Sequence, residues 1–119
     1  MGSRTERSKK AINHWFSLGH KRCAYCHCQL VWNKDQKNTA TVEHLVPKCQ
    51  GGTEALVNLI VVCQTCNNRR GHTDLLDWVK GRPLEQWITQ KYINSIAFYN
   101  VAGRKLQINK KKVKNLLTA

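Results

Sequence analysis

Two pairs of cysteines with the same spacing constrain the fold of this chain most strongly. Cys23 and Cys26 form one C-x-x-C pair, and Cys63 and Cys66 form the second. Two intervening residues let one tight turn present both sulfur atoms to a single tetrahedral ion, and zinc takes four such ligands. We therefore predict a structural zinc site made by these four thiolates and closed to any further ligand.

The remaining thiols leave alternatives at this site. Cys28 or His27 could replace Cys26 as a ligand, although C-x-C is the rarer spacing, and Cys49 is predicted to be a free thiol. A redox dithiol is disfavoured because there are two pairs and neither lies in a thioredoxin-like pattern. The N-terminal segment has charge but no apolar signal region, so we expect a reducing compartment, where six cysteines indicate metal binding rather than disulfides.

The charge balance indicates a polyanionic partner. The 119 residues include 20 Lys and Arg against 7 Asp and Glu, which gives a formal net charge of +13. Nucleic acid is the simplest partner for such a chain, and a basic surface kept for solubility is the plainer alternative. No apolar run approaches the length of a membrane span, and no long basic amphipathic helix ends in an apolar anchor, so we expect no membrane role. The length fits one domain.

The spacing of apolar residues and breakers predicts the order of elements in the N-terminal half. A basic amphipathic helix is expected over residues 5–18, ending at Gly19. A strand is expected over residues 39–46, followed by a loop over 47–55 that contains a proline and two glycines. Residues 56–62 form a second apolar segment that leads directly into the second cysteine pair.

Further helices are predicted in the C-terminal half. A helix begins after Cys66 and breaks at Gly71, and Asp74 can cap the next short helix. Pro83 suits the first turn of a longer helix that reaches about Tyr99. Its apolar stripe, for which we favour core packing over base stacking, is Leu84, Trp87, Ile88, Tyr92, Ile96 and Tyr99. A basic tail follows, made by Arg104, Lys105, Lys110, Lys111, Lys112 and Lys114.

The segment between and after the cysteine pairs resembles the HNH endonucleases, the zinc-stapled branch of the ββα-metal nucleases. The residues that carry the resemblance are "VEHLVPK", a glycine pair, and "NLIVVCQTCNNRRG", and it covers about residues 22–73. It implies an α+β fold with a small ββα-metal (HNH/His-Me finger) core stapled by the four-cysteine zinc site. The chain is then a single domain, 1–119, with a helical extension over about 74–119.

The resemblance implies an endonuclease that hydrolyses DNA, with His44 as the general base that activates water. Glu43 and Asn67 would bind a catalytic divalent ion, Mg²⁺ or Mn²⁺, and Asn58 would orient His44 or its loop. Histidine has a suitable pKa for this role, and hard ions prefer oxygen ligands. Asn58 could instead be a simple turn residue, and Asn67 a helix cap. Adjacent side chains on a strand point to opposite faces, so the acid–histidine pair shares a site only if the strand ends or twists there.

Four basic residues near the motif are candidates for contacts with nucleic acid: Lys48, Arg69, Arg70 and His72. Guanidinium groups are planar and always charged, which suits phosphate contacts, and a solvated helix face is the alternative. Asn68 competes with its neighbour Asn67 for the metal role. DNA is favoured over RNA, in the cytoplasm of a bacterial cell or a phage-infected host. A double-strand break would need a homodimer or two visits. The rival hypothesis is an inactive zinc-stapled nucleic-acid-binding or regulatory protein on the same fold.

Overall fold

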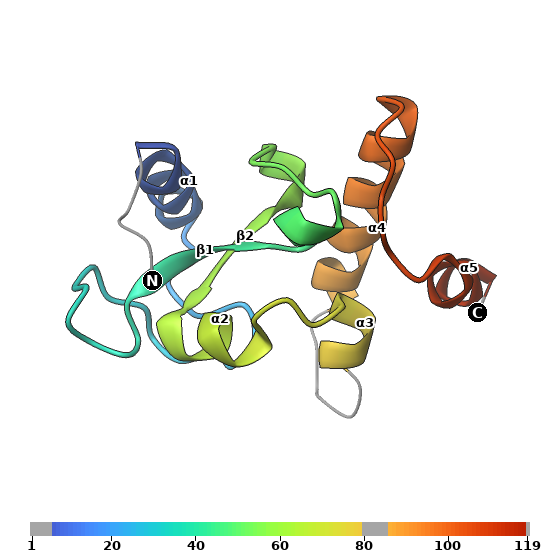
Figure 1. Cartoon of the computed structure of the whole chain (residues 1–119). Helices are drawn as coiled ribbons and strands as arrows, with labels where there is room; N and C mark the ends of the chain where they lie inside the picture. The colour runs from blue at the N-terminus through green and yellow to red at the C-terminus, as the bar shows by residue number, and fades with distance from the viewer. Residues whose placement is uncertain (1–5, 80–85, 119) are drawn as a thin grey trace.

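A short antiparallel hairpin between helices organises the chain, as the computed structural model in Figure 1 shows for residues 6–79 and 86–118. The elements follow in the order α1 (Glu6–Ser17), β1 (Ala40–His44), η1 (Lys48–Gln50), η2 (Leu56–Asn58), β2 (Leu59–Cys63), α2 (Gln64–Arg70), α3 (Leu75–Trp78), α4 (Gln86–Val101) and α5 (Lys110–Thr118). The predicted α+β fold class is confirmed, with β1, β2 and α2 in the order of a ββα unit.

The hairpin lies in the core because helices cover it. β1 and β2 pair in antiparallel register from Ala40 opposite Cys63 to His44 opposite Leu59. Every residue of β2 is buried, since α1 and α2 both contact the two strands and lie above and below them in Figure 1. β1 is shorter than the predicted strand. It ends at His44 because the next carbonyls in line, of His44 and Leu45, accept hydrogen bonds from the Arg70 side chain instead.

The predicted helix boundaries agree with the structure where it describes them. Gly19 follows α1 with a φ of 87° and donates its N–H to Phe16 at 2.9 Å, a left-handed turn that glycine adopts readily. Gly71 follows α2 with a φ of 55°. Asp74 caps α3, and its Oδ1 accepts the N–H of Leu76 at 3.0 Å. The expected start of α4 at Pro83 lies outside the described residues.

The apolar stripe of α4 packs largely into the core, as predicted. Ile88, Tyr92, Ile96 and Tyr99 are buried, whereas Trp87 remains 38% exposed. The Trp87 ring lies 5.5 Å from that of Trp15 on α1, centroid to centroid. Leu84 falls outside the described residues. Within residues 6–79 and 86–118, no helix is both long enough and apolar enough to cross a membrane.

The C-terminal extension holds the loop between β1 and β2. Ser95 Oγ donates to the carbonyl of Val57 at 2.6 Å, and Tyr99 Oη accepts the N–H of Thr53 at 2.8 Å. After α4, the N–H of Gln107 donates to the carbonyl of Gln50 at 2.8 Å, and Arg104 donates to that of Gly51. We call these four contacts the loop clamp.

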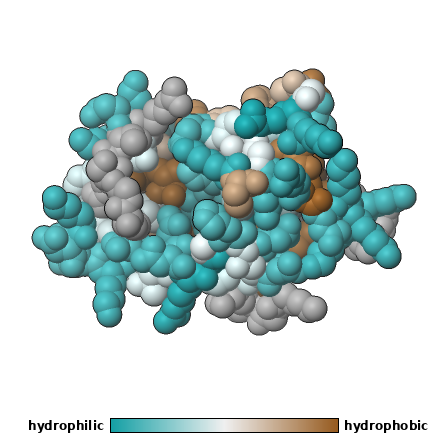
Figure 2. Space-filling view, viewed as in Figure 1, coloured by the Kyte–Doolittle hydropathy of each residue, from teal (hydrophilic) through white to brown (hydrophobic). Residues whose placement is uncertain are grey.

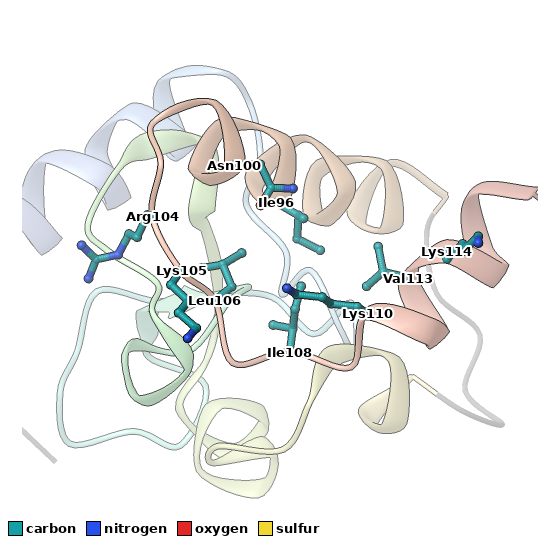
Figure 3. Close-up of a pocket in the computed structure, with 9 residues that line it drawn as sticks. All are labelled: Ile96, Asn100, Arg104, Lys105, Leu106, Ile108, Lys110, Val113 and Lys114. Carbon is teal, nitrogen blue, oxygen red and sulfur yellow. The ribbon is translucent and has the colours of Figure 1, made fainter.

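A second hollow lies between α4 and α5, with a volume of about 350 Å³ (Figure 3). Apolar side chains line its interior and basic ones its rim; the lining residues are Ile96, Asn100, Arg104, Lys105, Leu106, Ile108, Lys110, Val113 and Lys114. An ion pair between Lys112 and Asp77 ties α5 to α3.

Candidate active site

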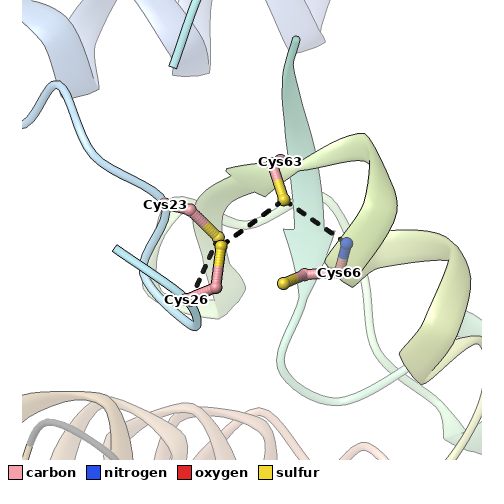
Figure 4. A group of neighbouring side chains, drawn as sticks. All are labelled: Cys23, Cys26, Cys63 and Cys66. Atoms are coloured by element: carbon pink, nitrogen blue, oxygen red, sulfur yellow. Dashed lines mark hydrogen bonds between the residues drawn. The ribbon is translucent and has the colours of Figure 1, made fainter. Parts of the chain in front are cut away.

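The two C-x-x-C pairs meet at one point, where the first knuckle faces the junction of β2 and α2 (Figure 4). The four sulfur atoms of Cys23, Cys26, Cys63 and Cys66 all lie within 4.8 Å of one another. Backbone N–H groups point at them, as where Cys66 N donates to Cys63 Sγ at 3.4 Å. His27 turns the chain back after the first pair with a φ of 64°. Four soft sulfur donors at this spacing fit a tetrahedral zinc ion.

The electrostatics of the cysteine cluster also suit a metal cation. Burial raises the pKa of Cys23. At Cys26 burial acts in the same direction, but hydrogen bonds from its neighbours outweigh it and lower the pKa to about 7. Crowded thiols of this kind lose their protons to a bound cation, which the thiolates then neutralise. Cys28 is not one of the four clustered sulfurs, and Cys49 is an exposed free thiol as predicted.

Glu43 is a buried carboxylate with an unsatisfied oxygen. It lies on β1 with 5% of its surface exposed, and its Oε2 has no hydrogen-bond partner. The Arg70 guanidinium is 3.5 Å away, which is too long for a strong bond. Burial raises the pKa of this carboxyl to about 7, even though the charge of Arg70 acts in the opposite direction. An unpaired buried carboxylate oxygen is costly, and a hard cation would satisfy it.

His44 is held by a glutamate that sequence reasoning missed. His44 Nε2 lies 2.9 Å from Glu54 Oε1, and Lys48 Nζ lies 2.5 Å from the same oxygen. Burial alone would raise the pKa of Glu54, but the hydrogen bonds from Lys48 and His44 dominate and lower it. The Glu54 carboxylate is therefore ionised at neutral pH.

Asn67 presents an oxygen to the same place. It lies in the first turn of α2, and its Nδ2 donates to Thr41 Oγ1 at 2.9 Å and to the carbonyl of Val42 at 3.0 Å. A carbonyl can only accept, so the amide nitrogen faces β1 and the amide oxygen faces away from it. The resulting pocket, about 160 Å³ in volume, is lined by Glu43, His44, Pro47, Lys48, Asn67, Gly71 and His72.

The pocket answers the question of strand geometry. Glu43 and His44 are sequence neighbours, yet both line it. His44 is the last residue of β1, and the chain turns away after it, so the alternation of strand faces does not separate the two side chains.

Arg70 does not reach the surface, where a phosphate contact was expected. It is 1% exposed, and its guanidinium donates to the carbonyls of His44 and Leu45, both at 2.8 Å. It also donates to the carbonyl of Thr73 at 2.9 Å. This side chain therefore fixes the end of β1 that carries Glu43 and His44. By contrast, Arg69 is exposed, and Lys48 and His72 are exposed at the pocket.

Asn58 braces the loop rather than His44. Its Oδ1 accepts the N–H of Val46 at 2.8 Å, and its Nδ2 donates to the carbonyls of Val46 and Thr53 at 3.0 and 3.1 Å. Gly52 lies against this network. A Cβ at Gly52 would lie 1.7 Å from the carbonyl oxygen of Val46. The glycine pair thus permits a close approach of two backbone segments, in addition to making a turn.

Replacing Gly52 with alanine should therefore destabilise the zinc-loaded protein by about 3 kcal/mol or more, because backbone must move to relieve the clash. Gly19→Ala is the matched control: Gly19 has a φ of +87°, and a Cβ added there would meet nothing within 4 Å. That control carries backbone strain alone, about 1–2 kcal/mol. Urea unfolding followed by circular dichroism measures both. Equal losses for the two variants would contradict the close approach at Gly52.

Comparison with known proteins agrees with this arrangement. A ββα unit with an acid–histidine pair and a zinc staple defines the class of ββα-metal nucleases. Residues 23–73 match the family model described as HNH endonuclease, so this segment is an HNH endonuclease domain. A stretch of 65 residues, 54% of this chain, is 32% identical to the CRISPR-associated endonuclease Cas9 of Corynebacterium diphtheriae. The match covers 6% of that protein, so the chain corresponds to a small part of it. No solved structure matches.

Proposed function

We propose that this chain is a metal-dependent endonuclease that hydrolyses phosphodiester bonds in DNA. One observation carries the proposal: Glu43, His44 and Asn67 line one pocket inside the HNH domain, and a buried oxygen of Glu43 lacks a partner there. A protein that only binds nucleic acid has no need to keep a costly unpaired carboxylate beside a histidine.

His44 is the general base in this proposal. It takes a proton from a water molecule, whose oxygen attacks the phosphorus in line with the leaving 3′ oxygen. The products are a 5′-phosphate and a 3′-hydroxyl. Arg70 and Asn58 act through the backbone, since the first fixes the end of β1 and the second fixes the loop that follows.

Glu43 and Asn67 are the proposed ligands of a Mg²⁺ or Mn²⁺ ion. Both offer oxygen atoms, which these hard ions prefer, and two protein ligands leave room for water and a phosphate. When bound, such an ion neutralises charge on the phosphate and on the leaving oxygen. The Arg70 guanidinium lies on the other side of the Glu43 carboxylate and helps to keep it ionised.

The basic surface supports a polyanionic substrate. Arg69, Lys48 and His72 are exposed near the pocket, and the face in Figure 2 is predominantly hydrophilic. The rim of the hollow in Figure 3 adds Arg104, Lys105 and Lys110, and the loop clamp brings this segment next to the active-site loop. Such contacts bind phosphates without reading sequence, so affinity should fall as salt rises.

A plasmid-nicking assay tests the proposal. The zinc-loaded protein should convert supercoiled DNA to the open circle with Mg²⁺ or Mn²⁺, and should stop when these ions are withheld by dialysis. Zinc content must be measured after dialysis, because loss of the structural ion would also stop cleavage. If DNA and RNA both survive either ion while zinc stays bound, the enzyme hypothesis is wrong and the chain is a binding or regulatory protein.

A further inference from the structure

A glutamate from the loop after β1 contacts the proposed base. We propose that Glu54 is a positioning residue that fixes the tautomer of His44, so that Nδ1 is the nitrogen that accepts the proton from water. This inference rests on the proposed function and adds to it a residue outside the acid–histidine–asparagine pattern.

The contact is short and sheltered. His44 Nε2 lies 2.9 Å from Glu54 Oε1, and each side chain is 22% exposed. The loop does not leave Glu54 free to wander. Its neighbour Thr53 bonds to Tyr99 through both its N–H and its hydroxyl, each at 2.8 Å. The geometry of the pair is therefore set by the fold, including α4 of the C-terminal extension.

The charge state of Glu54 decides which ring nitrogen carries the proton. An ionised carboxylate can only accept hydrogen bonds, so Nε2 of a neutral His44 must be the donor. Lys48, which bonds to the same carboxylate oxygen, favours that ionised form. Nδ1 is then the nitrogen with a free lone pair, and among the described residues it makes no hydrogen bond. A histidine whose second nitrogen is held by a carboxylate has a fixed ring orientation and a fixed tautomer.

The same contact assists the chemical step. An O–H bond of water breaks and its proton goes to Nδ1, while the water oxygen forms the new P–O bond. The bond from phosphorus to the 3′ oxygen breaks with its electron pair, and solvent protonates that oxygen. His44 is then an imidazolium that donates through Nε2 to Glu54, which stabilises its positive charge. Lys48 shares the carboxylate, so Glu54 keeps its own charge and does not take the proton.

Two measurements on the full-length, zinc-loaded protein test this inference. The first is the tautomer of His44, measured by long-range ¹H–¹⁵N correlation on ¹⁵N-histidine-labelled protein at a pH where the ring is neutral. We expect the proton on Nε2 in the wild type. In Glu54→Gln, the amide can donate to Nε2, and the Nδ1–H form should appear. A wild-type ring protonated on Nδ1 would overturn the inference, and this result needs no variant.

The second measurement is cleavage. Glu54→Gln should lower the kcat of metal-dependent nicking on the order of 100-fold, with the KM for DNA little changed, because the wrong tautomer cannot accept the proton. Asp35→Asn is the matched control, since it makes the same charge change at an exposed residue of another loop. If Glu54→Gln and Asp35→Asn both cleave like the wild type, the inference fails while the proposed function stands. If the wild type itself does not cleave, the proposed function fails, and the tautomer still decides whether Glu54 positions His44.

Discussion

His44→Ala should lower the rate of single-turnover DNA cleavage about 10²- to 10⁴-fold, the range expected for loss of a general base. His44 lines the pocket together with the buried carboxylate of Glu43. Alanine leaves that carboxylate and Asn67 in place, so DNA and the divalent ion should still bind. Quenched-flow or gel analysis of a labelled duplex, with enzyme in excess, measures the rate without product release.

His72→Ala is the matched control for this experiment, because His72 lines the same pocket but is exposed at its edge. It should weaken cleavage modestly at most. Both variants should retain zinc and the wild-type melting curve, which excludes misfolding as the cause. A His44→Ala protein that cuts as fast as the wild type would remove His44 from the chemistry.

The second large effect concerns the zinc staple. Cys63→Ser should leave the chain unfolded, or nearly so, at room temperature. Cys63 is the last residue of β2, and its sulfur also caps α2 by accepting the N–H of Cys66. Structural zinc sites contribute about 10–16 kcal/mol of apparent binding free energy, which exceeds the whole stability of an ordinary small domain. Circular dichroism and elemental analysis should show lost structure and lost zinc together.

Cys49→Ser is the control for the staple, since Cys49 is an exposed free thiol outside the cluster. That variant should keep one zinc per chain and its normal melting transition. Removing zinc from the wild type with a strong chelator should reproduce the Cys63→Ser result. A metal-free chain that still melts cooperatively at the wild-type temperature would show that the four cysteines are not a folding staple.

The parts of this molecule that could be predicted from sequence are those set by local chemistry. Paired cysteines two residues apart can meet one ion wherever they lie in the fold, so the zinc cluster was predictable. Asp74 caps α3 because an aspartate before a helix satisfies the first free N–H groups by itself. The meeting of Glu43 and His44 at one pocket could be stated only as a condition, because it depends on where the strand stops.

What the sequence could not give is set by tertiary contacts. Arg69 and Arg70 look alike in sequence, but successive residues of a helix point about 100° apart, and only the packing of α2 buries the second. Glu54 lies ten residues after His44 in a loop without periodicity, so nothing local indicates that the two side chains meet. Gly52 was predicted as a turn residue, and its close approach to Val46 appears only in three dimensions.

The loop clamp has a consequence for the modularity of this domain. The segment that matches the family ends at residue 73, yet Ser95, Tyr99 and Gln107 hold the loop that carries Glu54. A graft of residues 23–73 into another protein would carry the cysteines and the acid–histidine pair, but not the helix that fixes the loop. The nuclease segment is therefore not a portable cassette in this chain: its host must supply a replacement for α4.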